Sequence, residues 1–439
     1  MKRFQNLFKV IVIAMSTITL VSCSNLRVKK EEEKDNKEKV EASKEEEITL
    51  NLWTHFPGFE AIAEAFEKEN PNININIKNF DYDEYELEYK KSLVEDIGQA
   101  DILAIDSNHY GEFNSIKGLE DLLKPEYTAI NYKEDFDPEL WELGKSMDKS
   151  KLLGIPIGSA PIVTYYRADI LEKYGFPTEP KELAEYMKDK NNWVKIGETL
   201  KKDGISIVQW VAEIVKIYSA DMPYFNEKLE YQRDNEKFKE GIAVAREAME
   251  KGFSPFADIW SEKGKQLLRD GKFAMLYLGS WGARDLEALV PEQKGKWRVT
   301  SLPFGVYGWN NSSILSIAEN SKNKQAAWKF IEYCTFKYND KNRIGTVSSY
   351  LPFRNNESAF SQKNEFLGGQ EEQKFYEDIM ELTKEYPVTA LDNEAFKLWD
   401  DLVNIGLEEE YSDDKIMENI RTKVASSFAK EKESLLKEK

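Results

Sequence analysis

The fold is decided by the segment from Thr49 to Asp106, which opens with the alternating residues Thr49-Leu50-Asn51-Leu52-Trp53. Past the turn residues 55–58, apolar side chains recur at helical spacing at Phe59, Ile62, Ala63 and Phe66. Asn72-Ile73-Asn74-Ile75-Asn76-Ile77 alternates again, a polar and aromatic helical stretch follows, and Ala100-Asp101-Ile102-Leu103-Ala104-Ile105-Asp106 is typical of a strand buried on both faces. This order predicts an α/β fold with an open sheet of parallel strands.

Polar and aromatic side chains follow two of these strands. In open α/β sheets, ligands bind beyond the carboxyl ends of the strands. Trp53 and His55 leave the first strand at this edge, and Asp106 and Asn108 leave the third. An acid at the end of a buried strand meets solvent, caps a helix or holds a ligand. We therefore expect part of a binding site here, although Trp53 can also face the core and His55 can also cap a loop.

A second set of elements begins near residue 153. Residues 153–167 are expected to be extended and to lead into a helix over Asp169 to Tyr174. Residues 272–281 predict a strand that ends in the turn Gly279-Ser280-Trp281, followed by a helix over Ala283 to Leu289. The Gly and Asn residues of 307–311 favour a loop. No repeat of about 20 to 50 residues is present, which argues against a solenoid.

The N-terminus has the features of an export signal. Lys2, Arg3 and Lys9 accompany a short apolar run at 10–15, too short to span a bilayer, which needs about 20 residues. Leu20-Val21-Ser22-Cys23 is similar to the bacterial lipobox, which implies cleavage after residue 22 and lipid on Cys23. We expect residues 1–22 to be a signal peptide and 23–47, which are rich in Lys and Glu, to be a flexible tether. A plain secretory signal with an incidental Cys23 is the alternative.

Composition narrows the classes of function. The net charge of −18 falls to about −21 once residues 1–22 are removed, which disfavours binding to nucleic acid and to anionic lipid. Two histidines and two cysteines offer little for a transition-metal site. Cys334 lies in an apolar helical pattern and is expected to be buried. No Gly-rich phosphate loop, G-x-S-x-G or H-E-x-x-H motif occurs, so we expect no cofactor, no metal and no catalytic residues.

Several passages carry a family resemblance when they are taken in chain order. They are Leu52-Trp53-Thr54-His55, residues 100–106, 154–158 with 163–166, 271–275 with Gly279-Ser280-Trp281, 320–331, and Tyr350-Leu351-Pro352. Over about residues 48 to 430, the sequence resembles the extracellular solute-binding proteins of bacterial ABC importers (family 1), in the carbohydrate-binding branch related to maltose-binding protein. No single passage is diagnostic, but their order behind a lipobox and a tether is.

The resemblance implies a two-lobed periplasmic-binding-protein-like fold (type II), each lobe an open, mostly parallel sheet flanked by helices. By analogy we place lobe one at 48–160 plus 312–357, and lobe two at 161–311 plus 358–439. It also implies that a sugar or oligosaccharide lies in a cleft between the lobes and that hinge closure buries it. We expect a monomer, lipid-anchored on the outer face of the cytoplasmic membrane or in the periplasm, that delivers its ligand to ABC permease subunits.

Binding a sugar requires planar apolar groups for stacking and polar groups for the hydroxyls. Trp281 is expected to expose its ring at the end of a strand, and Trp260 to reach the cleft from lobe two. Trp399 is expected in the core. The full set of predicted ligand contacts is Trp53, His55, Asp106, Asn108, Trp260, Trp281, Trp309, Asn310 and Tyr350.

Three other classes of function stay open. A lipid-anchored carbohydrate-active enzyme needs two carboxylates about 5 to 9 Å apart, and the many acids of this sequence do not exclude such a pair. A binder of a non-sugar solute shares the fold, and a surface adhesin lacks a closing cleft. The absence of a catalytic motif and the resemblance along the whole domain favour a sugar binder that is not an enzyme.

Overall fold

The computed structural model describes residues 47–94, 100–339, 347–354, 360–384, 386 and 388–437. The predicted signal peptide, the lipidation site at Cys23 and the tether up to residue 46 lie outside the described residues. Within the described residues, no helix combines the length and the apolar character that crossing a membrane requires.

The first three strands follow the sequence pattern. β1 (Ile48–Thr54) pairs in parallel with β2 (Ile73–Asn79) on one side and with β3 (Ile102–Asp106) on the other. α1 (Phe59–Glu69) buries the four apolar residues that the helical spacing selected. All five residues of β3 are buried because the strand lies between β1 and β7. The parallel α/β arrangement predicted for this segment is confirmed.

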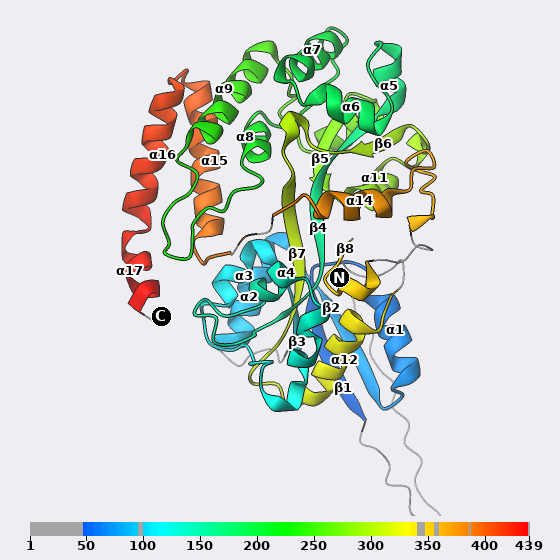
Figure 1. Ribbon diagram of the computed structural model, residues 1–439, viewed down its shortest axis with the longest axis vertical. Helices are drawn as coiled ribbons and strands as arrows, with labels where there is room; N and C mark the ends of the chain where they lie inside the picture. The colour runs from blue at the N-terminus through cyan, green and yellow to red at the C-terminus, as the bar shows by residue number, and fades with distance from the viewer. Residues whose placement is uncertain are drawn as a thin grey trace, which may run out of the picture. The chain divides into compact units, whose positions relative to one another are not determined.

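Two long strands, β4 (Ile155–Arg167) and β7 (Gly308–Ile317), pair along much of their length (Figure 1). The strand order is β2-β1-β3-β7-β4-β5, with β6 (Trp297–Thr300) and β8 (Val347–Ser348) also beside β4. The early residues of β4 pair with β7 and β8, and the late ones with β5 (Met275–Gly279) and β6. β4 therefore runs from one set of strands into the other, and all of its residues are buried.

Strand direction beyond β3 differs from the mostly parallel sheets expected for both lobes. β7 is antiparallel to β3, and β5, β6, β7 and β8 are all antiparallel to β4. The physical reason is that one long strand, β4, pairs with strands of both sets. β5, β6, β7 and β8 all run in the direction opposite to β4. The loop expected at 307–311 is also wrong, because residues 308–311 pair with β4 inside β7. Hydrogen bonds to β4 override the local preference of Gly and Asn.

The described residues bury their apolar side chains in separate clusters. One cluster draws on residues 50–157 and 309–336, and we call this part the first half. Two further clusters draw on 162–306 with 391–428, and on 163–299 with 347 and 366–380; we call this part the second half. Cys334 is buried in the first-half cluster, as predicted. The lobe boundaries given above remain a prediction.

Helices cover both halves, and several begin at a side chain that accepts a hydrogen bond from the first turn, as Asp106, Asp137, Asp189, Asn235, Ser261 and Ser412 do. The first half contains α1, α2 (Tyr82–Val94), α3 (Ser107–Phe113), α4 (Pro138–Leu143), α12 (Lys324–Phe336) and the 3₁₀ turns η1 (Pro125–Tyr127), η2 (Ala129–Asp135) and η5 (Leu351–Phe353). The second half contains α5 (Ala168–Lys173), α6 (Pro180–Met187), α7 (Lys190–Lys201), α8 (Ala212–Tyr218), α9 (Glu236–Lys251), α10 (Glu262–Arg269), α11 (Gly282–Leu289), α14 (Glu372–Met380), α15 (Asp392–Glu408), α16 (Asp413–Ser427), α17 (Ala429–Lys437), η3 (Pro291–Gln293) and η4 (Pro303–Gly305).

Candidate ligand-binding site

The end of β3 gathers several of the predicted polar residues. Asp106 is 2% exposed and caps α3, because its Oδ1 accepts a hydrogen bond from the Asn108 amide at 2.9 Å. Its Oδ2 accepts a second bond from Asn311 Nδ2 at 2.7 Å. Asn310 in turn donates from Nδ2 to Asn311 Oδ1 at 2.9 Å. The structure thus brings Asp106, Asn108 and Asn310 into one hydrogen-bonded group, and the capping role that the sequence allowed for Asp106 is present.

An aromatic group surrounds His55, in the loop after β1. The His55 ring lies 4.4 Å from the Tyr85 ring and 5.2 Å from the Tyr82 ring, centroid to centroid. Tyr82 is 47% exposed, and it is a candidate that sequence reasoning missed. The His55 Nε2 and the Tyr85 hydroxyl are buried without a hydrogen-bond partner among the described residues. Burial, followed by the positive charge of His109, lowers the pKa of His55 to about 4, so its imidazole is neutral at pH 7.

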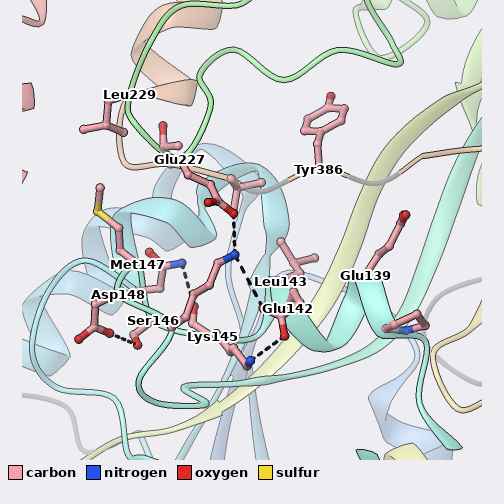
Figure 2. A pocket seen from close by; sticks show the side chains of 15 residues that line it. Glu139, Glu142, Leu143, Lys145, Ser146, Met147, Asp148, Glu227, Leu229 and Tyr386 are labelled. Carbon is pink, nitrogen blue, oxygen red and sulfur yellow. Dashed lines mark hydrogen bonds and ion pairs between the residues drawn. The ribbon is translucent and has the colours of Figure 1, made fainter. Parts of the chain in front are cut away.

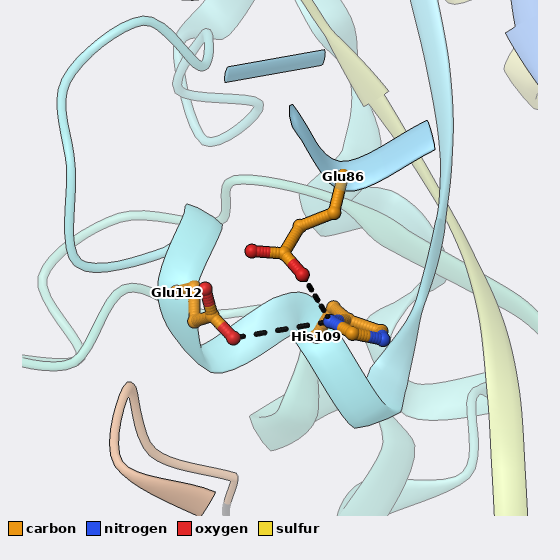
Figure 3. A group of neighbouring side chains, drawn as sticks. All are labelled: Glu86, His109 and Glu112. Atoms are coloured by element: carbon orange, nitrogen blue, oxygen red, sulfur yellow. Dashed lines mark ion pairs between the residues drawn. The ribbon is translucent and has the colours of Figure 1, made fainter. Parts of the chain in front are cut away.

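His109 lies between two carboxylates (Figure 3). Its Nδ1 is 2.9 Å from Glu86 Oε2 and 3.8 Å from Glu112 Oε1, and these three side chains have a spacing that suits metal ligands. The Lys90 ammonium pairs with both carboxylates, and Asn393 Nδ2 of α15 donates to Glu112 Oε1 at 3.2 Å.

The charges within this group balance. Burial alone would lower the pKa of His109, but hydrogen bonds to Glu112 and Glu86 and the charge of Glu86 raise it to about 9. The imidazolium and the Lys90 ammonium therefore neutralise Glu86 and Glu112. We interpret the group as an internal ion cluster that joins α2, α3 and α15.

The second half presents two neighbouring tryptophans. Trp281 follows β5 directly, and its ring centroid lies 6.3 Å from that of Trp260, which is 46% exposed. A Cβ on Gly279 would come within 2.2 Å of Trp281 Nε1, so only glycine allows the ring to fold against the end of the strand. The turn Gly279-Ser280-Trp281 therefore positions the Trp281 ring beside Trp260.

Three further candidates lie at and just before α8, where sequence reasoning did not look. Trp210, Glu213 and Lys216 recur every three residues in an otherwise buried segment, and that spacing is the signal that could have found them. Lys216 is exposed, yet the surrounding protein desolvates its ammonium and lowers its pKa, against the charges of Glu213, Asp400 and Asp106. Because the charge of Lys216 also acts on Asp106, this helix face of the second half lies near the end of β3.

Three predicted contacts pack elsewhere, in the core of the first half. Trp53 is 5% exposed, with its ring 5.0 Å from that of Phe80. Trp309 is 4% exposed, and its Nε1 donates to Ser159 Oγ at 3.0 Å. The half-buried Tyr350 ring lies 5.2 Å from that of Phe336. These rings take the core position that the sequence also allowed for Trp53, and their contact with a ligand remains a prediction.

Trp399, in contrast, is fully buried on α15, as expected from the sequence.

A separate cavity of about 530 Å³ lies beside α4 (Figure 2). Its walls come from Asn114, from side chains within 138–149, from Glu227 and Leu229, and from Tyr386, Val388 and Thr389. The Lys149 ammonium pairs with Glu227 at 2.6 Å and connects the first half to the second. The nine predicted contacts are absent from the residues that line this cavity, so we do not assign the ligand to it.

Comparisons with known proteins agree with this fold. A family model described as bacterial extracellular solute-binding protein matches residues 61–366. The chain belongs to this family, and the resemblance read from the sequence is confirmed. A lactose-binding protein of Rhizobium radiobacter is 24% identical over 348 residues, covering 73% of this chain and 79% of the relative.

Solved structures match the same fold. A crystal structure of an extracellular solute-binding protein of family 1 superposes with a TM-score of 0.73 at 18% identity, covering 86% of this chain and 99% of the other. The galacto-N-biose-/lacto-N-biose I-binding protein of an ABC transporter from Bifidobacterium longum gives 0.73 at 15% identity, with 87% and 97% covered. The two-lobed α/β fold is thereby established, and these relatives are binding proteins, not enzymes.

Proposed function

We propose that this protein captures a sugar or oligosaccharide and delivers it to the permease of an ABC transporter. The observation that carries the proposal is the Trp260–Trp281 pair, because adjacent indole rings that remain partly exposed gain free energy when the apolar face of a sugar covers them. The polar group around Asp106 provides the partners for hydroxyls. The charge of Lys216 acts on Asp106, so this part of α8 lies near the polar group.

The polar group has unused capacity for hydrogen bonds. Each Asp106 oxygen accepts one bond within the protein and can accept another, since a carboxylate oxygen has two acceptor sites. His55 Nε2 and the Tyr85 hydroxyl have no partner among the described residues. Buried groups of this kind gain when a ligand hydroxyl pairs with them. The ligand contacts that we propose are therefore His55, Tyr82, Asp106, Asn108 and Asn310, together with Lys216, Trp260 and Trp281.

Closure of the two lobes around the ligand would bury it, and the closed form would dock on the permease. We also propose that lipid on Cys23 and the tether after it hold the protein at the outer face of the membrane. Confinement raises the effective concentration of a binder at its partner. Replacing Cys23 with Ala should release the protein from the membrane and impair uptake, with ligand affinity unchanged. Loss of affinity in that variant would contradict this role for the anchor.

The test of the proposed function is a ligand screen on the purified protein. Lactose, lacto-N-biose and the glucose and maltose series are added while tryptophan fluorescence and thermal stability are recorded. At one hundred times its dissociation constant, a true ligand should add about 2.7 kcal/mol to the free energy of unfolding. Trp281→Leu should weaken that ligand, whereas Trp297→Phe, in the core of the second half, should leave affinity unchanged.

Two outcomes would overturn the proposal. If no saccharide changes fluorescence or stability, and mass spectrometry of the gently purified protein finds a non-sugar solute, the ligand class is wrong. If the protein cleaves the saccharide that it binds, the enzyme hypothesis replaces this one.

A further inference from the structure

An exposed ion pair joins the two halves beside the cavity at α4 (Figure 2). The Lys149 ammonium of the first half lies 2.6 Å from Glu227 Oε1 of the second half, and the two side chains are 47% and 60% exposed. The cavity of about 530 Å³ lies between the same segments, so side-chain packing between the halves is incomplete here. The ion pair is therefore a principal contact across this boundary.

Both loops that carry the pair contain a strained backbone conformation. Lys149 has a φ of +60°, and Leu229, two residues after Glu227, has a φ of +57°. Both values lie in the left-handed region, which costs free energy for residues other than glycine. Such strain persists only where the surrounding structure fixes the backbone. The two loops are thus held in defined shapes on either side of the cavity.

One polar side chain in each loop fixes that shape. Asp148 Oδ1 accepts a hydrogen bond from the Ser150 amide at 3.0 Å. Asn226 Oδ1 accepts hydrogen bonds from the amides of Lys228 and Glu230, both at 2.9 Å. These bonds lie within one loop each, so each loop keeps its shape when the halves move. Movement of the halves therefore changes the distance between the loops and leaves each loop intact.

The ion pair and the polar group of the proposed ligand surface lie at opposite ends of α3. Asp106 caps the start of this helix. Asn114, at its end, lines the cavity and donates from Nδ2 to the Lys145 carbonyl oxygen at 3.2 Å. Lys145 belongs to the loop that carries Lys149. The first half thus presents the ligand residues at one end of α3 and the ion pair at the other.

The strands that connect the halves pass beside the cavity. β4 pairs with strands of both sets, and β7 pairs with β4 along much of its length. The ring of Tyr386, on the cavity wall, lies 5.4 Å from the ring of Trp309 in β7. When two lobes rotate about connecting strands, one side of the connection closes and the other side opens. Closure at the Asp106 end of α3 therefore separates the loops at the Asn114 end.

We propose that the Lys149–Glu227 pair opposes closure of the two halves and so lowers the affinity for the ligand. The inference rests on the proposed function, in which the lobes close around a ligand. Separating the pair costs free energy, and this cost reduces the net free energy of binding to the closed form. Both groups are exposed, so their attraction is modest and salt weakens it. Ionic strength thus regulates ligand affinity through a pair that does not contact the ligand.

The first experiment measures the distance between the two loops in the protein without ligand. Spin labels are attached to the variants Lys151→Cys and Lys228→Cys, two exposed positions in these loops. The background carries Cys23→Ala, and Cys334 is buried. Pulsed electron–electron resonance then gives the distribution of distances between the labels, and melting temperatures verify that each variant folds.

Three substitutions are compared in this background. Glu227→Gln and Lys149→Gln each remove the pair, and a double variant combines them. Asp221→Asn is the matched control, because Asp221 pairs with Lys237 at the same distance of 2.6 Å within the second half. The control removes an exposed ion pair of equal length that does not join the halves.

We expect one short distance in the unmodified protein and an added, longer population in Glu227→Gln and Lys149→Gln. The double variant should match the single ones, because the second substitution removes a partner that is already lost. Raising the salt concentration from about 20 mM to about 500 mM should lengthen the distance in the unmodified protein only. If both single variants and the control give the same distances at low salt, the pair does not hold the halves and the proposal is wrong, whether or not a saccharide binds.

The second experiment titrates the same variants with lactose, lacto-N-biose and the maltose series. Glu227→Gln and Lys149→Gln should bind the ligand about two- to fivefold more tightly at low salt, and this gain should disappear at high salt. Asp221→Asn should bind as the unmodified protein does. Longer distances between the loops together with equal or weaker binding would contradict the proposal and leave the proposed function intact. If the distances change as expected and no saccharide binds any variant, the pair restrains the halves and the proposed function fails.

Discussion

The two surfaces that we assign to the ligand are built in opposite ways. In the first half, Asp106 is 2% exposed and both of its carboxylate oxygens are hydrogen-bonded within the protein. In the second half, Trp260 is 46% exposed and contacts Trp281 through its ring. The first surface is polar and already held in place, whereas the second leaves part of its aromatic area exposed to solvent. Fixed hydrogen bonds give orientation, and stacking gives affinity.

The two histidines of the chain show the same contrast on a smaller scale. His55 is packed among aromatic rings, and its pKa is lowered to about 4 by burial and by the charge of His109. Burial lowers the pKa of His109, but the hydrogen bonds to Glu112 and Glu86 outweigh burial and raise this pKa to about 9. Both rings contact Tyr82. The side chains around each ring thus decide its charge: His55 is neutral among aromatic rings, and His109 is charged beside two carboxylates.

The largest expected effect separates a core tryptophan from a surface one. Trp399→Ala should lower the free energy of unfolding by about 3 to 5 kcal/mol, because the ring is fully buried and leaves a cavity. Trp281→Ala should cost less stability and weaken the saccharide about tenfold. Urea unfolding and fluorescence titration of both variants measure the two effects. A ligand affinity that falls with Trp399→Ala and not with Trp281→Ala would reverse our assignment.

Asp106→Ala tests the polar surface. The variant removes a helix cap, worth about 1 kcal/mol, and any bond to a ligand hydroxyl, so affinity should fall about 10- to 100-fold. Asp189→Ala is a matched control, because Asp189 caps α7 through the amide of Asn191 at the same distance of 2.9 Å. Calorimetric titration should show weaker binding for the first variant only. Equal affinity in both variants would mean that Asp106 is a cap and nothing more.

In the unmodified protein, the free energy of unfolding should fall as pH rises toward 9, and His109→Gln should remove this fall. The folded pKa of about 9 lies above the ordinary histidine value of 6.5, so the folded chain keeps a proton that the unfolded chain releases. The stabilisation is complete below pH 6.5 and is lost as pH rises through 9, by about 2 kcal/mol between pH 6.5 and 8.5. Melting curves across this range should be flatter for the variant. An unchanged slope would show that the ion cluster does not hold the charge on His109.

His55→Phe gives the smallest effect, on the acid side. The folded pKa of about 4 lies below 6.5, so the unfolded chain takes up a proton that the folded chain excludes. Stability should therefore fall as pH decreases from 6.5 toward 4, by about 1 kcal/mol at pH 5.5. The variant should lack this loss when melting temperatures are compared at pH 7 and 5.5. If the variant loses as much stability as the unmodified protein, titratable groups other than His55 cause the loss.

The sequence predicted the first half better than the second. The pattern from β1 to β3 is local, since alternation and helical spacing follow from which face of each element is buried. β5 and β6 run antiparallel to β4, a strand that pairs with both sets of strands. Local spacing of apolar residues does not predict this pairing. Trp309 lies in β7 for the same reason, because pairing with β4 outweighs the loop preference of its neighbours.

The sequence likewise predicted some residues of the candidate site and missed others. The sequence selected Asp106, Asn108 and Trp281 because each follows the end of a predicted strand, Asp106 and Asn108 at the edge where ligands bind in open α/β sheets and Trp281 in a Gly-Ser-Trp turn. It missed Trp210, Glu213 and Lys216, which lie in a segment whose many apolar residues resemble a core helix. Only their exposure and the charge of Lys216 near Asp106 distinguish them.

The amino-acid sequence by itself determined the acidic charge, the family and the order of elements from β1 to β3, because these depend on composition and on spacing along the chain. Tertiary structure alone decided that Asp106 caps a helix while its second oxygen bonds Asn311, that Trp309 packs in the core, and that one histidine is neutral while the other is charged. Burial and the distance between charges set these properties, and both are created only when distant segments meet.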